Sequence, residues 1–391
     1  MERNVETCLK SMGEELISFT QEAVRIKSIS DQEGELAHCI EARMKQLGYD
    51  EVFIDSTGNV VGRIGKEGKV ILFDSHMDTV EVNDEADWIV PPFSGQIVDG
   101  SVYGRGSVDM KSSIAASVYG AVIARDMGYT KGKTVYVTCS VDEEYCDGEN
   151  LKHLFEEKKL RPDFVVICEP SDNMVSLGHK GKAQIVIRTE GVSAHGSAPE
   201  KGVNAVYEMA EIISRVEKKN LELMASGPSH GTLVLSEISC TTASLNAVPS
   251  ECMIYLDRRM VLGETEQTIR DEMNEIIRGK HAVWEIGTLH RTSWTGTPLD
   301  YNPMHPAWKI EEEHPLTQAC NRAYEKIYGA VPETYDYWDY STNGVTPVSM
   351  GIPTIGFGPG VNKLAHMVNE HCEVSKIKEA CGFYAELIGE I

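Results

Sequence analysis

Metal-binding chemistry is suggested by the residues that follow a short apolar run at 70–73. His76 and Asp78 come just after this run, which a charged, glycine-containing turn precedes, so the run predicts a buried strand. In open α/β sheets, ligands bind beyond the carboxyl ends of the strands. Imidazole is a good zinc ligand, and a nearby carboxylate can fix its tautomer. An ordinary polar strand end has the same appearance, so other residues must decide.

Further metal-competent side chains stand where other strands end or loops begin. They are Asp109, the adjacent pair Glu143 and Glu144, Glu169, and His366. Histidines and carboxylates without cysteine suit a zinc-type site with two ions, in which one carboxylate bridges and another stays free as general base. Consecutive side chains at a strand end point in different directions, so the Glu143-Glu144 pair can supply both a ligand and a base.

Each of these residues also has an ordinary explanation when it is taken alone. Asp109 could cap the helix that begins beside it, and the glutamates could be solvated turn residues. His366 could be a hydrogen-bonded surface histidine. The recurrence of such residues at successive strand ends favours a shared site over these separate explanations.

The elements that must position these residues alternate between strands and helices. The expected strands lie near 51–54, 60–64, 70–73, 134–141, 163–168 and 352–357, with a hairpin around Asp99-Gly100. The expected helices lie near 5–26, 33–47, 104–125, 307–328 and 374–388. This alternation predicts an α/β fold, with a mostly parallel mixed sheet flanked by helices.

The pattern changes between about 181 and 294. There the order is strand, helix, two strands, helix and strand, which is the βαββαβ order of an α+β ferredoxin-like sandwich. Prolines at 298, 303 and 306 mark a crossover back to the first pattern. We therefore predict a catalytic domain made of residues 1–180 and 295–391, interrupted by an inserted lid domain at 181–294. Clefts between domains are favoured binding sites.

Composition excludes several classes of partner. The net charge of −23 argues against a nucleic-acid or anionic membrane surface, and it requires a local cation to capture any anionic substrate. The ten cysteines are scattered, no apolar stretch reaches the roughly 20 residues of a membrane span, and residues 1–4 lead into an amphipathic segment. We therefore expect a cytoplasmic protein. Motifs for dinucleotides, phosphate loops, serine nucleophiles and H-E-x-x-H zinc helices are absent from the sequence.

The order of five motifs resembles the dinuclear zinc metallopeptidase family of acetylornithine deacetylase, succinyl-diaminopimelate desuccinylase, aminoacylase and carboxypeptidase G. The motifs are S-H-M-D-T-V at 75–80, G-R-G-S-V-D-M-K at 104–111, D-E-E at 142–144, C-E-P at 168–170 and A-H-M-V-N-E at 365–370. The resemblance covers nearly the whole chain, inserted domain included. The segments 341–345 and 356–360 are most similar to the selenium-metabolism-linked hydrolase subgroup.

The resemblance implies a set of metal ligands. His76, Asp109 and Glu169 would bind one divalent ion, and Asp109, Glu144 and His366 would bind the other. Asp109 would bridge the two ions. Zinc is the expected metal, although cobalt and manganese accept similar nitrogen and oxygen ligands.

The resemblance also implies roles around these ligands. Asp78 would orient His76, and Glu143 would take a proton from the attacking water and later deliver it to the leaving amine. A cis peptide bond is expected between Asp109 and Met110.

Substrate contacts are implied in both domains. His195 would reach the active site of the partner subunit and stabilise an oxyanion, Asn246 would contact substrate, and Arg259 would bind a substrate carboxylate. Its neighbour Arg258 should lie on the sheet surface, because adjacent strand residues face opposite ways. Four more residues are expected to line the substrate pocket, namely Thr342, Asn343, Gly344 and Gly358. As ordinary loop or turn residues, all of these would need no function.

We therefore expect a homodimer, joined through the lid domain, that hydrolyses the amide bond of a small N-acyl or N-carbamoyl amino acid with a free carboxylate. A di- or aminopeptidase of the same family is the alternative among enzymes. Outside enzymes, the alternative is a non-catalytic protein that binds a small ligand. The filled ligand and base positions favour an enzyme.

Overall fold

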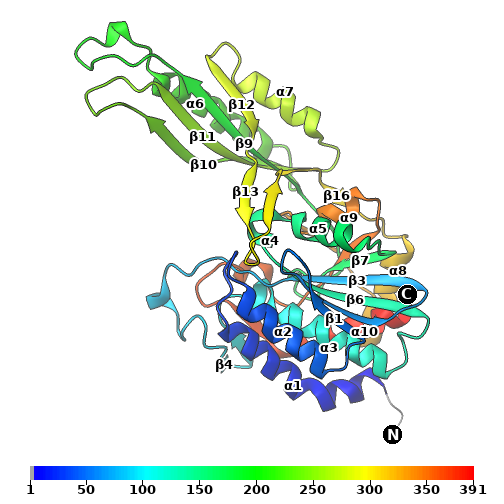
Figure 1. Cartoon of the computed structure of the whole chain (residues 1–391). Coiled ribbons are helices and arrows are strands. Elements are labelled where there is room, and N and C mark those ends of the chain that lie inside the picture. Colours follow the sequence, from blue (N-terminus) through cyan, green and yellow to red (C-terminus); the bar gives the residue numbers. More distant parts are fainter. Residues whose placement is uncertain (1–3) are drawn as a thin grey trace.

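A nine-stranded mixed sheet carries the strand ends discussed above (Figure 1). In the computed structural model, which describes residues 4–391, its strands are β1 Glu51–Ile54, β2 Val60–Gly65, β3 Lys69–His76, β6 Lys133–Ser140, β7 Phe164–Ile167, β8 Ser176–His179, β16 Trp308–Lys309, β17 Asp336–Trp338 and β18 Thr354–Gly356. The order is β1-β2-β6-β3-β7-β18-β8-β16, with β17 paired to β8. The central strands β6, β3, β7 and β18 are parallel, so their carboxyl ends share one edge.

The apolar run of β3 is buried on both faces of this sheet. Ile71 and Phe73 pack into the larger hydrophobic core, whereas Leu72 packs into a second core on the opposite face. Parallel strands covered by helices on both sides have this near-continuous apolar character. The predicted α/β fold with a mixed sheet between helices is therefore confirmed.

Helices cover both faces of the large sheet. The larger core is covered by α1 Val5–Arg25, α2 Gly34–Gln46, α3 Ser112–Asp126, α8 Pro315–Tyr328 and α10 Val374–Glu390. On the other side lie α5 Glu149–Lys158 and the short α9 Val345–Ser349, and the short α4 Glu143–Cys146 precedes α5. Gly120 of α3 allows a close approach to α10, since a Cβ atom there would lie 2.9 Å from the Cys381 carbonyl oxygen.

A second, antiparallel sheet forms the lid domain. Its elements are β9 Gly181–Glu190, α6 Ala205–Met224, β10 Thr232–Thr241, β11 Glu251–Met260, α7 Glu266–Ile276, β12 Ala282–Ile286 and β15 Met304–His305. The strand order is β10-β11-β9-β12, with β15 also paired to β9, and α6 and α7 pack on one face over a separate hydrophobic core. The βαββαβ order agrees with the sequence prediction. The boundary at 294 stays a prediction, because the sheet still gains β15 at 304–305.

Two small sheets complete the fold, and one of them was not predicted. The three-stranded sheet of β4 Ile97–Val98, β5 Ser101–Tyr103 and β19 His371–Glu373 contains the expected hairpin at Asp99-Gly100. β13 Leu289–Thr292 and β14 Pro298–Tyr301 form a hairpin. The sequence predicted a strand at about 281–289 and then a crossover without further strands. Pro298 tolerates this because it is the first residue of its strand. The prediction also began α8 too early and missed α5.

Residues 1–3, part of the expected amphipathic start, lie outside the described residues. Within residues 4–391, no helix combines the length and apolarity needed to cross a bilayer.

Candidate metal centre

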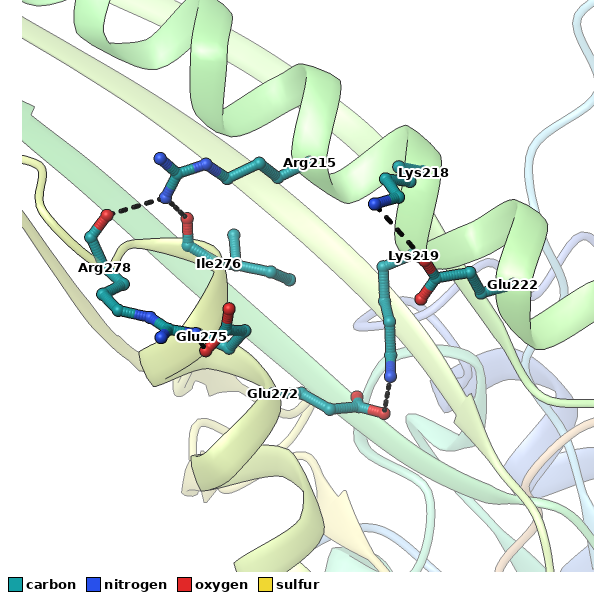
Figure 2. Close-up of a pocket in the computed structure, with 8 residues that line it drawn as sticks. All are labelled: Arg215, Lys218, Lys219, Glu222, Glu272, Glu275, Ile276 and Arg278. Atoms are coloured by element: carbon teal, nitrogen blue, oxygen red, sulfur yellow. Dashed lines mark hydrogen bonds and ion pairs between the residues drawn. The ribbon is translucent and has the colours of Figure 1, made fainter.

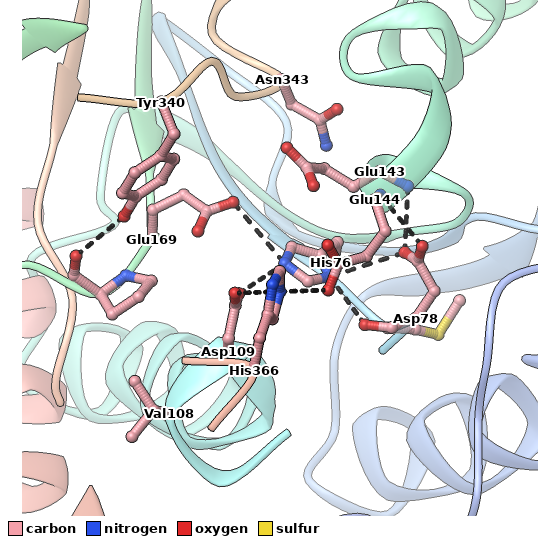
Figure 3. Close-up of polar contacts among 12 residues, drawn as sticks. His76, Asp78, Val108, Asp109, Glu143, Glu144, Glu169, Tyr340, Asn343 and His366 are labelled. Carbon is pink, nitrogen blue, oxygen red and sulfur yellow. Dashed lines mark hydrogen bonds and ion pairs between the residues drawn. The ribbon is translucent and has the colours of Figure 1, made fainter. Parts of the chain in front are cut away.

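The parallel strands β3, β6 and β7 end at one edge of the large sheet, and side chains at or just after these ends lie close together (Figure 3). His76 is the last residue of β3, and Glu169 lies two residues beyond β7. Glu143 and Glu144 begin α4, three residues beyond the end of β6. The sequence placed His76 just past its strand, whereas the strand runs through it.

Asp109 lies between two histidines at this edge. Asp109 Oδ1 is 2.9 Å from His76 Nε2, and Asp109 Oδ2 is 3.2 Å from His366 Nε2. Glu169 Oε1 is 3.6 Å from His76 Nε2, and Glu144 Oε1 is 3.0 Å from His366 Nε2. The five side chains thus form two groups that share Asp109, and this is the division that the family resemblance implies for two ions.

Glu143 lies beside the first of these groups. Ligand atoms of His76, Glu143 and Glu169 lie within 4.8 Å of one another, as do those of His76, Asp109 and Glu144. Burial, followed by the nearby Glu169 carboxylate, raises the pKa of Glu143 well above its usual value. A buried carboxyl group with a raised pKa is suited to accept a proton from water. Distance alone would also allow Glu143 to bind an ion, so its role as base stays a prediction.

The metal centre contains more carboxyl groups than histidine side chains. Burial raises the pKa of Glu144, and burial followed by the charge of Asp109 raises that of Glu169. Although burial opposes the effect, hydrogen bonds with Asp109 and Glu144 raise the pKa of His366 to about 10. Carboxylates gathered away from water repel one another unless cations neutralise them. This set of imidazole and carboxylate donors therefore fits two divalent ions.

Asp78 holds both His76 and the loop that carries the glutamate pair. His76 Nδ1 lies 2.9 Å from the Asp78 carbonyl oxygen, closer than the 3.5 Å to its carboxylate. The carboxylate instead accepts hydrogen bonds from the backbone N–H of Glu143 at 3.0 Å and of Glu144 at 3.1 Å, and from the Ser30 hydroxyl at 2.7 Å. Asp78 thus orients His76 mainly through its backbone and the glutamate pair through its side chain.

Glu370 fixes the backbone of Asp109 through hydrogen bonds. Its carboxylate accepts hydrogen bonds from the backbone N–H of Val108 at 2.8 Å and of Asp109 at 3.1 Å. Arg105 pairs with the same carboxylate at 2.7 Å and donates to the His366 carbonyl oxygen at 3.1 Å. The sequence motifs contained Arg105 and Glu370 but gave them no role. The expected cis peptide bond after Asp109 is present.

A cavity of about 380 Å³ opens above the centre and reaches the base of the lid domain. Its lining includes the predicted residues Asp109, Glu143, Glu144, Glu169, His366 and Arg259, and also Asp147, Lys182, Tyr340, Ser341, Asn362 and Ala365. Lys182 and Arg259 are opposite each other on β9 and β11, and Lys182 pairs with Asp147 at 2.8 Å. Sequence reasoning missed Lys182, whose only signal was its position directly before a segment predicted as a strand at 183–189.

Arg259 and Arg258 face opposite sides of β11, as predicted. Arg259 faces the cavity, and Asp257 holds its guanidinium through contacts of 2.7 and 3.0 Å. Arg258 is fully buried and pairs with Glu264 and Glu272 near α7. The expectation that Arg258 lies on the sheet surface was wrong, because α7 covers that face.

Asn343 lies behind the wall of this cavity. Its amide donates to Asp74 at 2.8 Å and to Ser140 at 3.0 Å, and its carbonyl oxygen accepts from the backbone N–H of Gly148 at 2.7 Å. The structure thus gives Asn343 a role in tying strand ends together. Among the described residues, the cavity lining does not include it.

Thr342, Gly344 and Gly358 also lie outside the lining given by residues 4–391. Thr342 is fully buried, and its hydroxyl accepts a hydrogen bond from the Gly344 N–H at 3.1 Å. A Cβ atom at Gly358 would lie 2.4 Å from the Glu169 carbonyl oxygen, so glycine is needed for the Glu169 backbone to pass. These contacts support the site from behind, and the adjacent Tyr340 and Ser341 face the cavity instead.

His195 and Asn246 lie at the far end of the lid domain. Both are exposed, and the Gly196 N–H donates to the Asn246 carbonyl oxygen at 2.6 Å. They follow β9 and β10, whose far ends lie away from the large sheet in Figure 1. Since β9 starts beside the cavity and ten extended residues span about 33 Å, His195 is far from the centre of its own chain.

Another cavity, of about 510 Å³, lies between α6 and α7 and is lined by charged side chains (Figure 2). Its lysines and arginines are held by its own glutamates and carbonyl oxygens, such as Lys219 by Glu272 at 3.4 Å and Arg215 by the Ile276 carbonyl at 2.8 Å. It shares no residue with the metal centre.

Comparisons with known proteins agree with this geometry. Residues 72–390 match peptidase family M20/M25/M40. The chain is 36% identical to the uncharacterised protein YgeY of Escherichia coli K12 (97% of this chain, 94% of that protein). It is 25% identical to succinyl-diaminopimelate desuccinylase of a Bradyrhizobium species (95% and 98%). Bacillus subtilis YxeP, described as a dinuclear metal binding M20 peptidase, has the same fold at 15% identity and a TM-score of 0.70 (97% and 98%). The chain therefore belongs to peptidase family M20/M25/M40 and is a metal-dependent hydrolase of amide bonds.

Proposed function

We propose that the chain hydrolyses the amide bond of a small N-acyl or N-carbamoyl amino acid that carries a free carboxylate. One observation supports this most directly: the lining of the cavity over the metal centre combines the carboxyl groups of the centre with Arg259 and Lys182 of the lid domain, although Lys182 also pairs with Asp147. A substrate can then place its amide at the carboxyl groups of the centre and its carboxylate at the cationic side chains.

The two ions would be held by His76, Asp109 and Glu169 and by Asp109, Glu144 and His366. Divalent ions bound there polarise a carbonyl group and lower the pKa of water. The desuccinylase and the dinuclear peptidase among the compared proteins are in keeping with such a centre. Zinc is the metal that we propose.

Glu143 carries the proton in the proposed reaction. It accepts a proton from water as the water oxygen attacks the amide carbonyl carbon, and it gives that proton to the nitrogen when the C–N bond breaks. Arg259 binds the carboxylate, and His195 of a partner subunit donates a hydrogen bond to the oxyanion. Because His195 is far from its own centre, this role requires a dimer, which we propose forms through the lid domain.

The test begins with metal analysis of the purified protein and a hydrolysis screen of N-acyl amino acids, N-carbamoyl amino acids and dipeptides. We expect two ions per chain and turnover of the first or second class. Glu143→Gln should lower kcat by at least about 100-fold with metal content retained, because only the base is lost. Glu156→Gln, on the exposed face of α5, is the matched control.

Each arm of the screen decides something. Turnover of dipeptides alone would favour the di- or aminopeptidase alternative, which uses the same centre. Two bound ions without turnover in any arm would count against a hydrolase of these substrates. Full activity in Glu143→Gln would remove the base assignment.

A further inference from the structure

The β13–β14 hairpin links the lid domain to the loop that carries the glutamate pair. It lies between β12 and β15 in the chain, and both of these strands pair with β9 of the lid sheet. In Figure 1, β13 extends from the lid domain towards α4, which begins with Glu143. The hairpin is therefore attached to the lid domain at both ends, and its tip reaches the domain of the large sheet.

The tip of the hairpin is docked on the body of the large sheet. The hydroxyls of Thr295 and Thr297 donate to the Ser56 carbonyl oxygen at 2.7 and 2.6 Å. The Trp294 ring lies so close to Gly58 that a Cβ atom there would be 2.1 Å from its nitrogen. These contacts hold the hairpin in place without touching Glu143 or Glu144.

Arg291 of β13 contacts the residues on both sides of the glutamate pair. Its Nε lies 3.4 Å from Asp142 Oδ1, directly before Glu143, and its guanidinium carbon lies 4.0 Å from the ring centre of Tyr145, directly after Glu144. Its Nη2 pairs with Asp31 at 2.5 Å, and this ion pair anchors the guanidinium on the domain of the large sheet. An ion pair and a cation–π contact therefore bracket the two glutamates.

The loop needs a cation at this point. Asp142 is fully buried, with a positive φ of 53°, and its backbone N–H donates to the buried Glu33 carboxylate at 3.1 Å. Arg291 is the cation paired with Asp142 and Asp31. Its loss would leave the buried Asp142 carboxyl group beside the partly exposed Asp31 carboxyl group without a cation, and the loop would have to move for Asp142 to reach water.

We propose that Arg291 is a positioning residue for the Glu143-Glu144 pair. Asp78 holds the backbone of the pair from the side of the metal centre, and Arg291 holds its flanking side chains from the side of the lid domain. The proposal rests on the proposed function, since Glu143 is the base there.

The experiment compares Arg291→Met and Arg291→Lys with Arg270→Met. Arg270 is a matched control because it also pairs with a glutamate and lies over an aromatic ring, Trp284, within the lid domain. We expect Arg291→Met to lower kcat about 10- to 100-fold with KM changed less than about threefold, as for residues that orient metal ligands. Arg291→Lys should recover part of kcat because it restores the charge. Arg270→Met should match the wild type.

A readout without turnover separates this proposal from the proposed function. Zinc affinity, measured by competition with a chromophoric chelator, should fall about tenfold in Arg291→Met because Glu144 is displaced. Weaker zinc binding supports the proposal even if no amide is hydrolysed. A lower melting temperature with unchanged kcat and unchanged zinc affinity would show a purely structural role and would overturn it.

Discussion

The Asp78 carboxylate accepts a hydrogen bond from the backbone N–H of Glu143 at 3.0 Å. This contact joins the loop after β3 to the start of α4, so the aspartate two residues after the proposed ligand His76 holds the backbone of the residue proposed as base. The same carboxylate also binds the next N–H, that of Glu144. The His-x-Asp motif is therefore a connection between two strand ends as well as a feature of one.

Asp78→Asn should lower kcat by about 10- to 100-fold, as for other residues that orient metal ligands. The amide oxygen can accept one of the two backbone N–H groups, but the amide nitrogen cannot accept the other. Steady-state kinetics with metal analysis on the same samples would check this. Wild-type kcat in a fully loaded Asp78→Asn protein would contradict the role given to its carboxylate.

Arg259→Met should raise KM for a carboxylate-bearing substrate by about 10- to 100-fold, because hydrogen bonds to charged groups contribute roughly 1.5–3 kcal/mol. The effect on kcat should be smaller. The matched control is the same substrate with its carboxylate converted to a primary amide, for which wild type and variant should have similar KM values. Equal KM increases for both substrates would show that Arg259 does not bind the carboxylate.

His195→Ala and Glu143→Gln should each be inactive alone and partly active when mixed. If His195 acts in the partner's site, each mixed dimer has one complete site, and free subunit exchange gives about a quarter of wild-type activity. Activity should be measured after exchange has been demonstrated with differently tagged chains. An inactive mixture after proven exchange would exclude action across subunits.

Glu33 should make stability depend on pH. Burial first, and then the charges of Asp78 and Asp142, raise its pKa from 4.5 to about 9. The folded chain therefore keeps this proton between about pH 4.5 and 9 while the unfolded chain releases it, so this group's contribution to stability is lost as pH rises through that window. The slope approaches about 1.4 kcal/mol per pH unit.

Glu33→Gln should make the pH dependence of stability shallower, because the amide is never ionised and its oxygen can still accept from the Asp142 N–H. Urea unfolding from pH 5 to 9 would measure the difference. Glu35→Gln, exposed in the first turn of α2 just after the N-cap residue Glu33, is the control and should keep the wild-type slope. Parallel curves for wild type and Glu33→Gln would show that Glu33 is not protonated in the folded chain.

The sequence was enough to predict the carboxyl ends of β3, β6 and β7 to within three residues, but it missed β8, β16 and β17. The run at 70–73 is apolar because both faces of β3 are buried, and the change to polar residues up to His76, which are buried as well, marks the carboxyl end of the strand. The same local signal applies to the residues after β6 and β7. The βαββαβ order of the lid domain was also readable, since each of its elements carries its own periodic pattern.

Tertiary contacts decided which residues face the cavity. Asn343 and Gly358 stand in polar, glycine-rich segments that resemble pocket walls, but hydrogen bonds to Asp74 and close packing on Glu169 place them behind the wall. Lys182 faces the cavity because β9 pairs with β11, and no local pattern encodes that register.

The sequence by itself determined the donor types of the metal centre and the order of the elements that carry them, because both depend on residue identity and on local periodicity. Only the tertiary structure decided that Arg291, about 150 residues from Asp142 in the chain, closes on the glutamate pair. This contact depends on how the β13–β14 hairpin, which has no strong local sequence signal, docks on the domain of the large sheet. The separation of two residues along the chain does not predict such docking.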